Sequence, residues 1–471
     1  MVTFHRHRDM KSTCTRCSLG TIVWTLAAWV VLLHLYASYS PHSSIPDSFS
    51  SSRKLPLYTE YEEFEDRAAE VKVPRFKRRG VPFNRQRRSR NISAAEDFVN
   101  PTSLKRTLYF PEKSLAVDPL NCPEVDKYHF YPGREWRDTD GKPIQAHGGG
   151  ILFVPQTETF YWYGENKDGR TYKLQKRSLA RVDVIGINCY SSKDLWAWKN
   201  EGIVLAAEKD NKTHDLYTSN VIERPKVIFN DKTNQYVMWM HVDNANYSKA
   251  SVGVAVSPSP VGPFIYLYSG RPHGFESRDM TLFKDDDGEA YLVYSSVENS
   301  ELHIGILTDD YLNLKGIMRR TMVGMHREAP AVFKHRGLYY LITSGCTGWA
   351  PNAALAHSAE SMMGPWVTLG NPCMGGNQES RQTTFFSQGT FVLPLPGLQD
   401  LFLFMADRWN SHDLKDSRYV WLPLTMDGPV DEPLEDDFEF PLWSRVSIHW
   451  HRRWALPSAW NSSSFRSNQV E

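Results

Sequence analysis

The chain has 471 residues, and its 54 Lys plus Arg balance its 54 Asp plus Glu, giving a net charge of +0. This length accommodates one large domain or two ordinary ones with extra terminal segments. A balanced charge points to neither a nucleic-acid partner nor a polyanionic substrate. Trp (15), Tyr (22) and Phe (23) are plentiful; such side chains fill β-structure and also offer flat faces to sugar rings.

The N-terminal region predicts a membrane anchor. Residues 1–18 form a basic tail, and residues 19–37 read LGTIVWTLAAWVVLLHLYA, without charge if His34 is neutral. At the helical rise this run is about long enough to cross a ~30 Å hydrocarbon layer. Positive charge before the run is typical of a cytosolic N-terminus, which predicts a single-pass type II topology with the remainder of the chain in the lumen. A cleaved signal peptide is the alternative, because Ala37, Ser38 and Ser40 follow the run.

Residues 38–104 are predicted to be a stem. They are rich in Ser, Pro and charge, and they contain the basic run RFKRRGVPFNRQRRSR at 75–90. Such a composition buries too little apolar surface to fold alone. The basic run is interpreted as a solvated linker, with a protease site or a polyanion contact as alternatives.

The cysteines and glycosylation sequons fit this topology. Cys14 and Cys17 would be cytosolic, where zinc binding and acylation are both open readings. The other four would lie in an oxidising lumen: Cys122, Cys189, Cys346 and Cys373. Their pairing is open, although Cys346 with Cys373 would close the shorter loop. The Asn-x-Ser/Thr sequons are at Asn91, Asn211, Asn246 and Asn461.

One hairpin pattern occurs five times in residues 105–445, which are predicted to form the main folded domain and to precede a tail at 446–471. The copies read HGGGILFVPQTETFYWYGE from His147, ERPKVIFNDKTNQYVMWMHV from Glu223, DMTLFKDDDGEAYLVYSS from Asp279, EAPAVFKHRGLYYLITSG from Glu328 and QGTFVLPLPGLQDLFLFMAD from Gln388. Each has two apolar strands around a turn of the kind that hairpins use. Repeated antiparallel sheets at this spacing predict an all-β, five-bladed β-propeller.

The opening residue of each copy is polar: His147, Glu223, Asp279, Glu328 and Gln388. In a propeller the first strand of each blade lines the axis, so these side chains are expected to meet at one rim of the channel. Any one of them could simply hydrogen-bond a neighbouring backbone. The shared register in all five copies favours a common site.

These motifs resemble glycoside hydrolase family 43, whose members are five-bladed propellers. The resemblance rests on SRDMTLF around Asp279, HREAPAVF around Glu328, QAHGGGI from Gln145, WYGENK from Trp162, ERPKVIFN from Glu223 and SQGTFV from Ser387. Together they are similar to the exo-β-1,3-galactanase branch, and within it to plant members with a Golgi anchor. The resemblance implies an inverting exo-glycosidase that removes galactose from the β-1,3-galactan chains of arabinogalactan glycans.

The resemblance also implies roles for single residues. Glu328 would be the acid, and Asp279 would tune its pKa and orient the substrate. The first blade departs from the common family pattern, since His147 stands where most members have an Asp. The galactanase branch shares that omission and implicates residues equivalent to Glu223 and Gln388, so either could position the attacking water.

Further side chains are candidates for binding substrate. His147 and Gln145 lie in the first-blade motif, and Glu165 either binds sugar hydroxyls or forms a salt bridge. The aromatic candidates for stacking on galactose, each with a place in the hydrophobic core as the competing expectation, are Trp162, Trp239, Trp349 and Trp409.

No metal or cofactor is expected. Asp285-Asp286-Asp287-Gly288 resembles a metal-binding motif, but it falls where a hairpin turn needs Asp and Gly. Three alternative functions stay open: an α-L-arabinofuranosidase or β-xylosidase, a non-catalytic carbohydrate-binding propeller, and a type II glycosyltransferase. The hairpin repeats argue against the last of these.

Overall fold

The computed structural model describes residues 109–174, 179–398, 400–429, 444–457 and 460. The expected cytosolic tail, the anchor at 19–37 and the stem at 38–104 lie outside these residues, as do Cys14, Cys17, Asn91 and Asn461. Within the described ranges no helix is long and apolar enough to cross a membrane.

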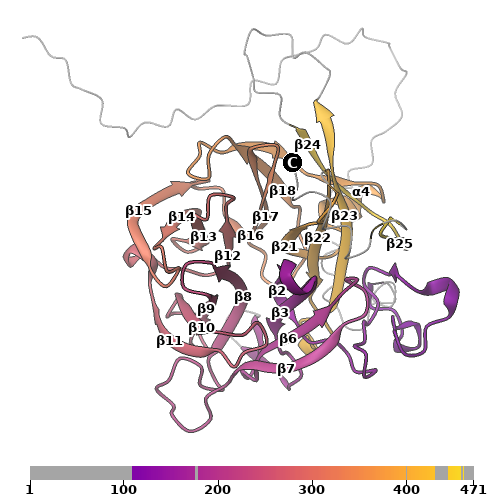
Figure 1. Ribbon diagram of the computed structural model, residues 1–471, viewed down its shortest axis with the longest axis horizontal. Helices are drawn as coiled ribbons and strands as arrows, with labels where there is room; N and C mark the ends of the chain where they lie inside the picture. The colour runs from indigo at the N-terminus through magenta and orange to yellow at the C-terminus, as the bar shows by residue number, and fades with distance from the viewer. Residues whose placement is uncertain (1–108, 175–178, 399, 430–443, 458–459, 461–471) are drawn as a thin grey trace, which may run out of the picture. The chain divides into compact units, whose positions relative to one another are not determined.

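Five antiparallel sheets form the blades (Figure 1). Blade one contains β2 (His147–Val154), β3 (Thr159–Glu165), β6 (Gly186–Ser192) and β7 (Lys199–Ala206). Blade two contains β8 (Val221–Asn230), β9 (Gln235–Asp243), β10 (Ser251–Ser257) and β11 (Ile265–Gly270). Blade three contains β12 (Met280–Lys284), β13 (Ala290–Ser296), β14 (Glu301–Leu307) and β15 (Leu314–Thr321).

Blade four contains β16 (Arg327–His335), β17 (Leu338–Gly345), β18 (Leu355–Ala359) and β19 (Val367–Gly370). Blade five contains β21 (Gln388–Pro394), β22 (Leu401–Arg408), β23 (Arg418–Pro429) and β24 (Ser444–His449), with β20 (Cys373–Met374) added in parallel to β24. The last long strand thus extends beyond the expected domain end at residue 445.

Short elements complete the described chain. β1 (His129–Phe130) pairs with β25 (Trp454–Ala455), which joins the segment before blade one to the segment after blade five. β4 (Thr171–Leu174) and β5 (Leu179–Val182) form a separate hairpin. The helical pieces are η1 (Lys113–Leu115), η2 (Glu124–Asp126), η3 (Pro155–Thr157), η4 (Pro272–Gly274), α4 (Gln378–Gln382) and η5 (Leu414–Asp416).

The first strand of each blade is the innermost one (Figure 1). β2, β8, β12, β16 and β21 pack against one another in a closed ring, each touching the inner strands of both neighbouring blades. Five sheets around a closed ring of inner strands make a five-bladed propeller, so the prediction from the hairpin repeats is confirmed. The radial arrangement protects the edges of these short sheets.

Apolar side chains between neighbouring blades form the core. Trp162, at 0% exposure, packs between blades one and five, and Trp239, at 1%, packs between blades two and three. A sugar cannot reach either ring, so the expectation that they stack on galactose is wrong for these two.

The four described cysteines are free thiols, and the suggested bridge between Cys346 and Cys373 is not formed.

Candidate active site

The residues that open the five hairpins lie where the innermost strands begin. His147 and Gln388 start β2 and β21, Glu328 is the second residue of β16, Glu223 is the third of β8, and Asp279 directly precedes β12. All five therefore occur at the same end of the ring of inner strands.

A local distortion of these strands helps to aim the side chains. The pairing register shifts close behind the opening residue in blades one, two, four and five. The residue that follows it is left-handed in three blades, with φ of 61° at Gly148, 56° at Arg224 and 51° at Ala329. Such a bulge re-aims a side chain, and a left-handed non-glycine residue costs about 1–3 kcal/mol. The strain is thus concentrated where the polar side chains converge.

A cavity of about 880 Å³ opens at this end of the inner strands. Glu223, Asp279, Glu328 and Gln388 line it from four different blades. Its wall also contains Glu165, Arg224, His241, Tyr247, Arg278, Glu298, Asn299, Cys346, Trp349 and Trp409. This volume lies in the range typical of small-molecule sites.

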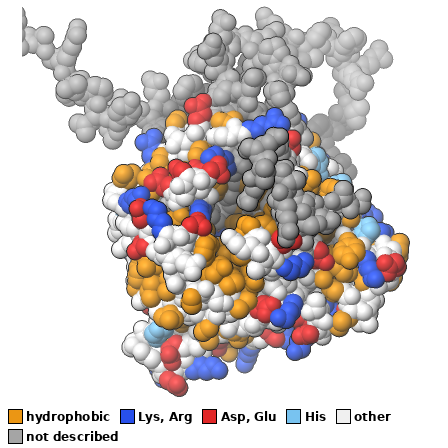
Figure 2. All heavy atoms as spheres, viewed as in Figure 1, with side chains coloured by type: hydrophobic (Ala, Val, Ile, Leu, Met, Phe, Trp, Pro, Cys, Tyr) orange, Lys and Arg blue, Asp and Glu red, His pale blue; other side chains and the backbone are white. Residues whose placement is uncertain are grey.

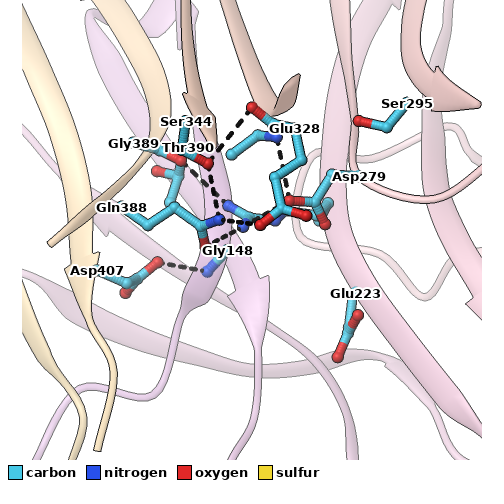
Figure 3. A network of polar contacts seen from close by, with 12 residues as sticks. Gly148, Glu223, Asp279, Ser295, Glu328, Ser344, Gln388, Gly389, Thr390 and Asp407 are labelled. Carbon is cyan, nitrogen blue, oxygen red and sulfur yellow. Dashed lines mark hydrogen bonds and ion pairs between the residues drawn. The ribbon is translucent and has the colours of Figure 1, made fainter. Parts of the chain in front are cut away.

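The amide of Gln388 has a full set of hydrogen-bond partners (Figure 3). Its Nε2 donates to Glu328 Oε1 (3.0 Å) and Ser344 Oγ (3.0 Å), both of which Figure 3 labels. Its Oε1 accepts from Arg224 Nη2 (2.6 Å) and from Trp409 Nε1 (3.0 Å). Arg and Trp nitrogens only donate, so they fix which end of the amide is oxygen. Gln388 is therefore held rigidly, with its N–H group directed at Glu328.

Glu328 is a buried carboxyl group beside another carboxyl group. Burial raises the pKa of Glu328 to about 8, the charge of Asp279 adds to the rise, and the charge of Arg224 opposes it. Asp279 pairs with Arg224 Nη2 at 2.9 Å and accepts the backbone N–H of Ala329 at 3.1 Å. Glu328 is consequently protonated near neutral pH.

Glu223 has the opposite electrostatic environment. It accepts a hydrogen bond from Tyr247 Oη (2.8 Å) and forms ion pairs with His241 Nδ1 (3.4 Å) and Lys167 Nζ (3.9 Å). Burial alone would raise its pKa, but His241 and Lys167 outweigh burial and lower the pKa of Glu223 to about 2. Burial likewise acts to lower the pKa of His241, whereas contacts with Asp243 and Glu223 raise it to about 9. Glu223 is therefore a carboxylate held by an imidazolium.

The cavity thus contains a protonated carboxyl group, that of Glu328, and an ionised one, that of Glu223. Figure 3 shows Glu223 standing apart from the group formed by Glu328, Asp279 and Gln388. The model of glycosyl hydrolases family 43 matches residues 156–412, more than half of the chain. The chain belongs to glycosyl hydrolase family 43. It is a glycoside hydrolase, as the sequence motifs indicated.

Solved structures of family 43 resemble this chain over most of the propeller. A β-1,3-galactosidase solved with galactodeoxynojirimycin is 40% identical, with a TM-score of 0.60, over 69% of this chain and 100% of that one. The exo-β-1,3-galactanase of Phanerochaete chrysosporium with galactose is 40% identical, with a TM-score of 0.56, over 63% of this chain and 64% of that one. The Clostridium thermocellum exo-β-1,3-galactanase is 35% identical, with a TM-score of 0.58, over 72% and 68%. A curated relative, the β-D-galactofuranosidase of Aspergillus niger, is 25% identical over 248 residues, 49% of this chain and 68% of the relative.

Two of the expected first-blade residues do not line the cavity of this family 43 enzyme. His147 is 0% exposed; its Nδ1 lies 2.9 Å from Asp407 Oδ1, and its ring stacks on Tyr419. Gln145 is buried between the backbones of Lys167 and Lys415, with which it makes hydrogen bonds of 3.2 and 3.0 Å. The expectation that His147 and Gln145 contact the sugar is therefore wrong. Both side chains are buried outside the cavity lining, where their contacts stabilise the surrounding structure.

Glu165 and two of the tryptophans do line the cavity. Glu165 pairs with Lys167 Nζ at 2.5 Å and accepts the backbone N–H of Arg224 at 3.2 Å, so the ion-pair alternative is realised at the cavity wall. Burial raises the pKa of Glu165. Trp349 and Trp409 meet edge to face, with ring centroids 5.1 Å apart.

Several functional residues escaped the sequence analysis, although a simple signal was available. The cross-strand partners of the opening residues are Glu165 for His147, His241 for Glu223, Ser344 for Glu328 and Asp407 for Gln388. In each hairpin, the residue on the second strand that lies opposite the opening residue can be located from the sequence by counting equal distances on both sides of the turn. This procedure would have found His241, Ser344 and Asp407. Arg224 and Lys167 lie inside quoted motifs, but their contacts depend on the fold.

Within the described ranges no group of three or more His, Cys, Asp or Glu is arranged to hold a metal ion. In the Asp285 turn, the backbone N–H of Asp285 bonds to Glu289, and its carboxylate contacts Lys334 and Tyr339 at 2.5 Å each. Asp285 thus joins the hairpins of blades three and four.

Proposed function

We propose that this family 43 enzyme is an inverting, exo-acting β-1,3-galactosidase that trims the β-1,3-galactan chains of arabinogalactan glycans. The observation that carries the proposal is the pairing, in one cavity, of a protonated Glu328 with an ionised Glu223. The proposal is supported by the similarity of the chain to a β-1,3-galactosidase and to two exo-β-1,3-galactanases, at 35–40% identity.

Glu328 is the general acid in this proposal. The leaving oxygen of a glycosidic bond needs a proton as the bond breaks, and the donor must be protonated at the working pH. A pKa of about 8 satisfies that requirement. The hydrogen bond from Gln388 Nε2 holds the carboxyl group at a fixed angle.

Glu223 is the better candidate for activating water. A general base must be ionised, and a pKa of about 2 keeps Glu223 ionised at every working pH. All four hydrogen-bonding positions of the Gln388 amide are filled by protein groups. An imidic-acid tautomer would turn Oε1 into a hydroxyl facing two donor-only nitrogens, those of Arg224 and Trp409. Gln388 therefore acts on Glu328 as a positioning residue.

The site of action is proposed to be the Golgi lumen. The support is the charge-free run at 19–37, the basic residues before it and the sequons in the propeller. With this topology the propeller and its cavity would lie in the lumen, where the enzyme would meet the proposed arabinogalactan substrate.

The deciding experiment is product analysis of the full chain on β-1,3-galactobiose and longer oligomers, with the anomer followed by NMR. Release of single galactose units as the α-anomer supports the proposal, because inversion converts a β-linkage into an α-product. Preferential release of arabinose or xylose from nitrophenyl glycosides would contradict it. Binding of β-1,3-galactan without release of sugar between about pH 4 and 9 would instead indicate a non-catalytic propeller.

A further inference from the structure

The loop between β9 and β10 carries a glycosylation sequon, Asn246-Tyr247-Ser248. Asn246 is exposed, and its Oδ1 accepts a hydrogen bond from Ser248 Oγ at 2.9 Å. An exposed Asn two residues before a Ser, with no Pro between, is the acceptor for N-linked glycans in the secretory pathway.

This loop is also part of the cavity wall. Tyr247 lines the cavity and donates a hydrogen bond from its Oη to Glu223 at 2.8 Å. Neighbouring Cα atoms are about 3.8 Å apart, so Asn246, where a glycan would be attached, is directly next to a residue of the cavity wall. Tyr247, Arg278 and Glu298 together form what is called here the blade two–three rim.

The rim is anchored on both sides. Arg278 Nη1 donates to the backbone oxygen of Tyr247 (3.0 Å), and its Nη2 lies 3.5 Å from Glu298. Arg271 Nη2 donates to the backbone oxygen of Ser248 at 3.1 Å. The backbone that follows Asn246 is therefore fixed beside the cavity wall, and a group attached to Asn246 starts from that fixed point.

We propose that Asn246 carries an N-linked glycan that narrows the cavity mouth at the blade two–three rim. The inference rests on the proposed lumenal location. N-glycans are bulky and hydrated, so one here would admit the end of an unbranched chain and hinder a chain with side branches near its end. The glycan would thus set which galactan ends the enzyme accepts.

The modification is a group transfer from a lipid diphosphate-linked oligosaccharide. A bond forms between Asn246 Nδ2 and the anomeric carbon of the oligosaccharide, and the bond from that carbon to the diphosphate oxygen breaks. The diphosphate lipid leaves with the electron pair, and the amide loses one proton.

The first test is the occupancy of Asn246 in the full chain made in a eukaryotic secretory pathway, measured by mass spectrometry of glycopeptides. Asn246→Gln should lose the glycan, whereas Ser248→Thr keeps the sequon and should retain it. The matched control is Asn211→Gln, because Asn211 is an exposed sequon in the connection between blades one and two, and neither of its neighbours in the chain lines the cavity. An unmodified Asn246 in a protein whose Asn211 is modified would overturn the proposal.

The second test compares kcat/KM on β-1,3-galactobiose and on branched arabinogalactan. Asn246→Gln, or endoglycosidase treatment of the native protein, should raise the value for the branched polymer several-fold and leave galactobiose unchanged; Asn211→Gln should change neither. An unchanged ratio of the two substrates would overturn the gating role. An occupied Asn246 in a protein that cleaves neither substrate would support the modification and overturn the proposed function instead.

Discussion

Asp279→Asn should move the alkaline limb of the pH–rate profile to lower pH. The carboxylate of Asp279 is one of the two causes that raise the pKa of Glu328 to about 8, the other being burial. An amide in its place still has an oxygen to accept the N–H of Ala329 and to face Arg224. The substitution therefore removes the charge while keeping the local contacts, so that the positive charge of Arg224 acts on Glu328 without an opposing carboxylate beside it.

The magnitude follows from the size of such interactions. A neighbouring charge in a shared site shifts a carboxyl pKa by about 1–3 units, and a shift of about 2 units corresponds to about 2.7 kcal/mol. At pH 7 the protonated fraction of a group with a pKa of about 8 is about nine-tenths; with a pKa of about 6 it is about one-tenth. The variant should thus lose about tenfold more activity at pH 7 than at pH 5.

The assay is kcat/KM for release of galactose from β-1,3-galactobiose between about pH 4 and 10. The position of the alkaline limb is the readout, since the height of the profile also reflects any role of Asp279 in orienting substrate. Asp286→Asn is the control: it removes one negative charge from the same blade at a side chain that is 86% exposed. An alkaline limb at the same pH in the Asp279 variant would refute the reasoning.

The remaining predictions concern the other groups of the cavity. Glu328→Gln should abolish turnover while leaving the affinity for galactobiose, measured by calorimetry, within about an order of magnitude; wild-type-like activity would exclude Glu328 as the acid. Gln388→Ala should be nearly inactive, because Glu328 loses its positioning donor, and an unaltered kcat on galactobiose would contradict that role. His241→Gln should lower activity at the acidic end of the profile relative to the wild type, because His241 helps to keep the pKa of Glu223 far below that range; an acidic end identical to that of the wild type would exclude Glu223 as the base.

The sequence predicted the fold well because the hairpin repeats reflect radial symmetry. Each repeat begins with a polar residue, and four of the five, from Glu223 to Gln388, do line the cavity. His147 does not, since Asp407 on β22 holds its ring in the interior. Asp407 is not among the residues predicted from the sequence, because the repeats were compared by their opening residues and Asp407 occurs at the far end of the second strand.

The tryptophans show a second limit. Trp162 and Trp409 both follow a hairpin turn, yet the first is buried between blades and the second faces the cavity. Trp162 lies in the middle of β3, where the neighbouring sheet covers it, and Trp409 follows the end of β22. For these two tryptophans, the position relative to the end of the second strand therefore predicts exposure to the cavity, whereas the residue type does not.

The distribution of cations explains why three carboxyl groups in one cavity can differ in protonation. Glu223 has His241 and Lys167 as ion-pair partners, and Asp279 has Arg224. Among the described residues no Lys, Arg or His forms an ion pair with Glu328, which receives hydrogen bonds from the amides of Gln388 and Asn299. Like charges that share a site cannot all stay ionised, so the proton goes to the carboxyl group that lacks a cation. The choice of Glu328 as the proton donor thus depends on where its neighbours place positive charge.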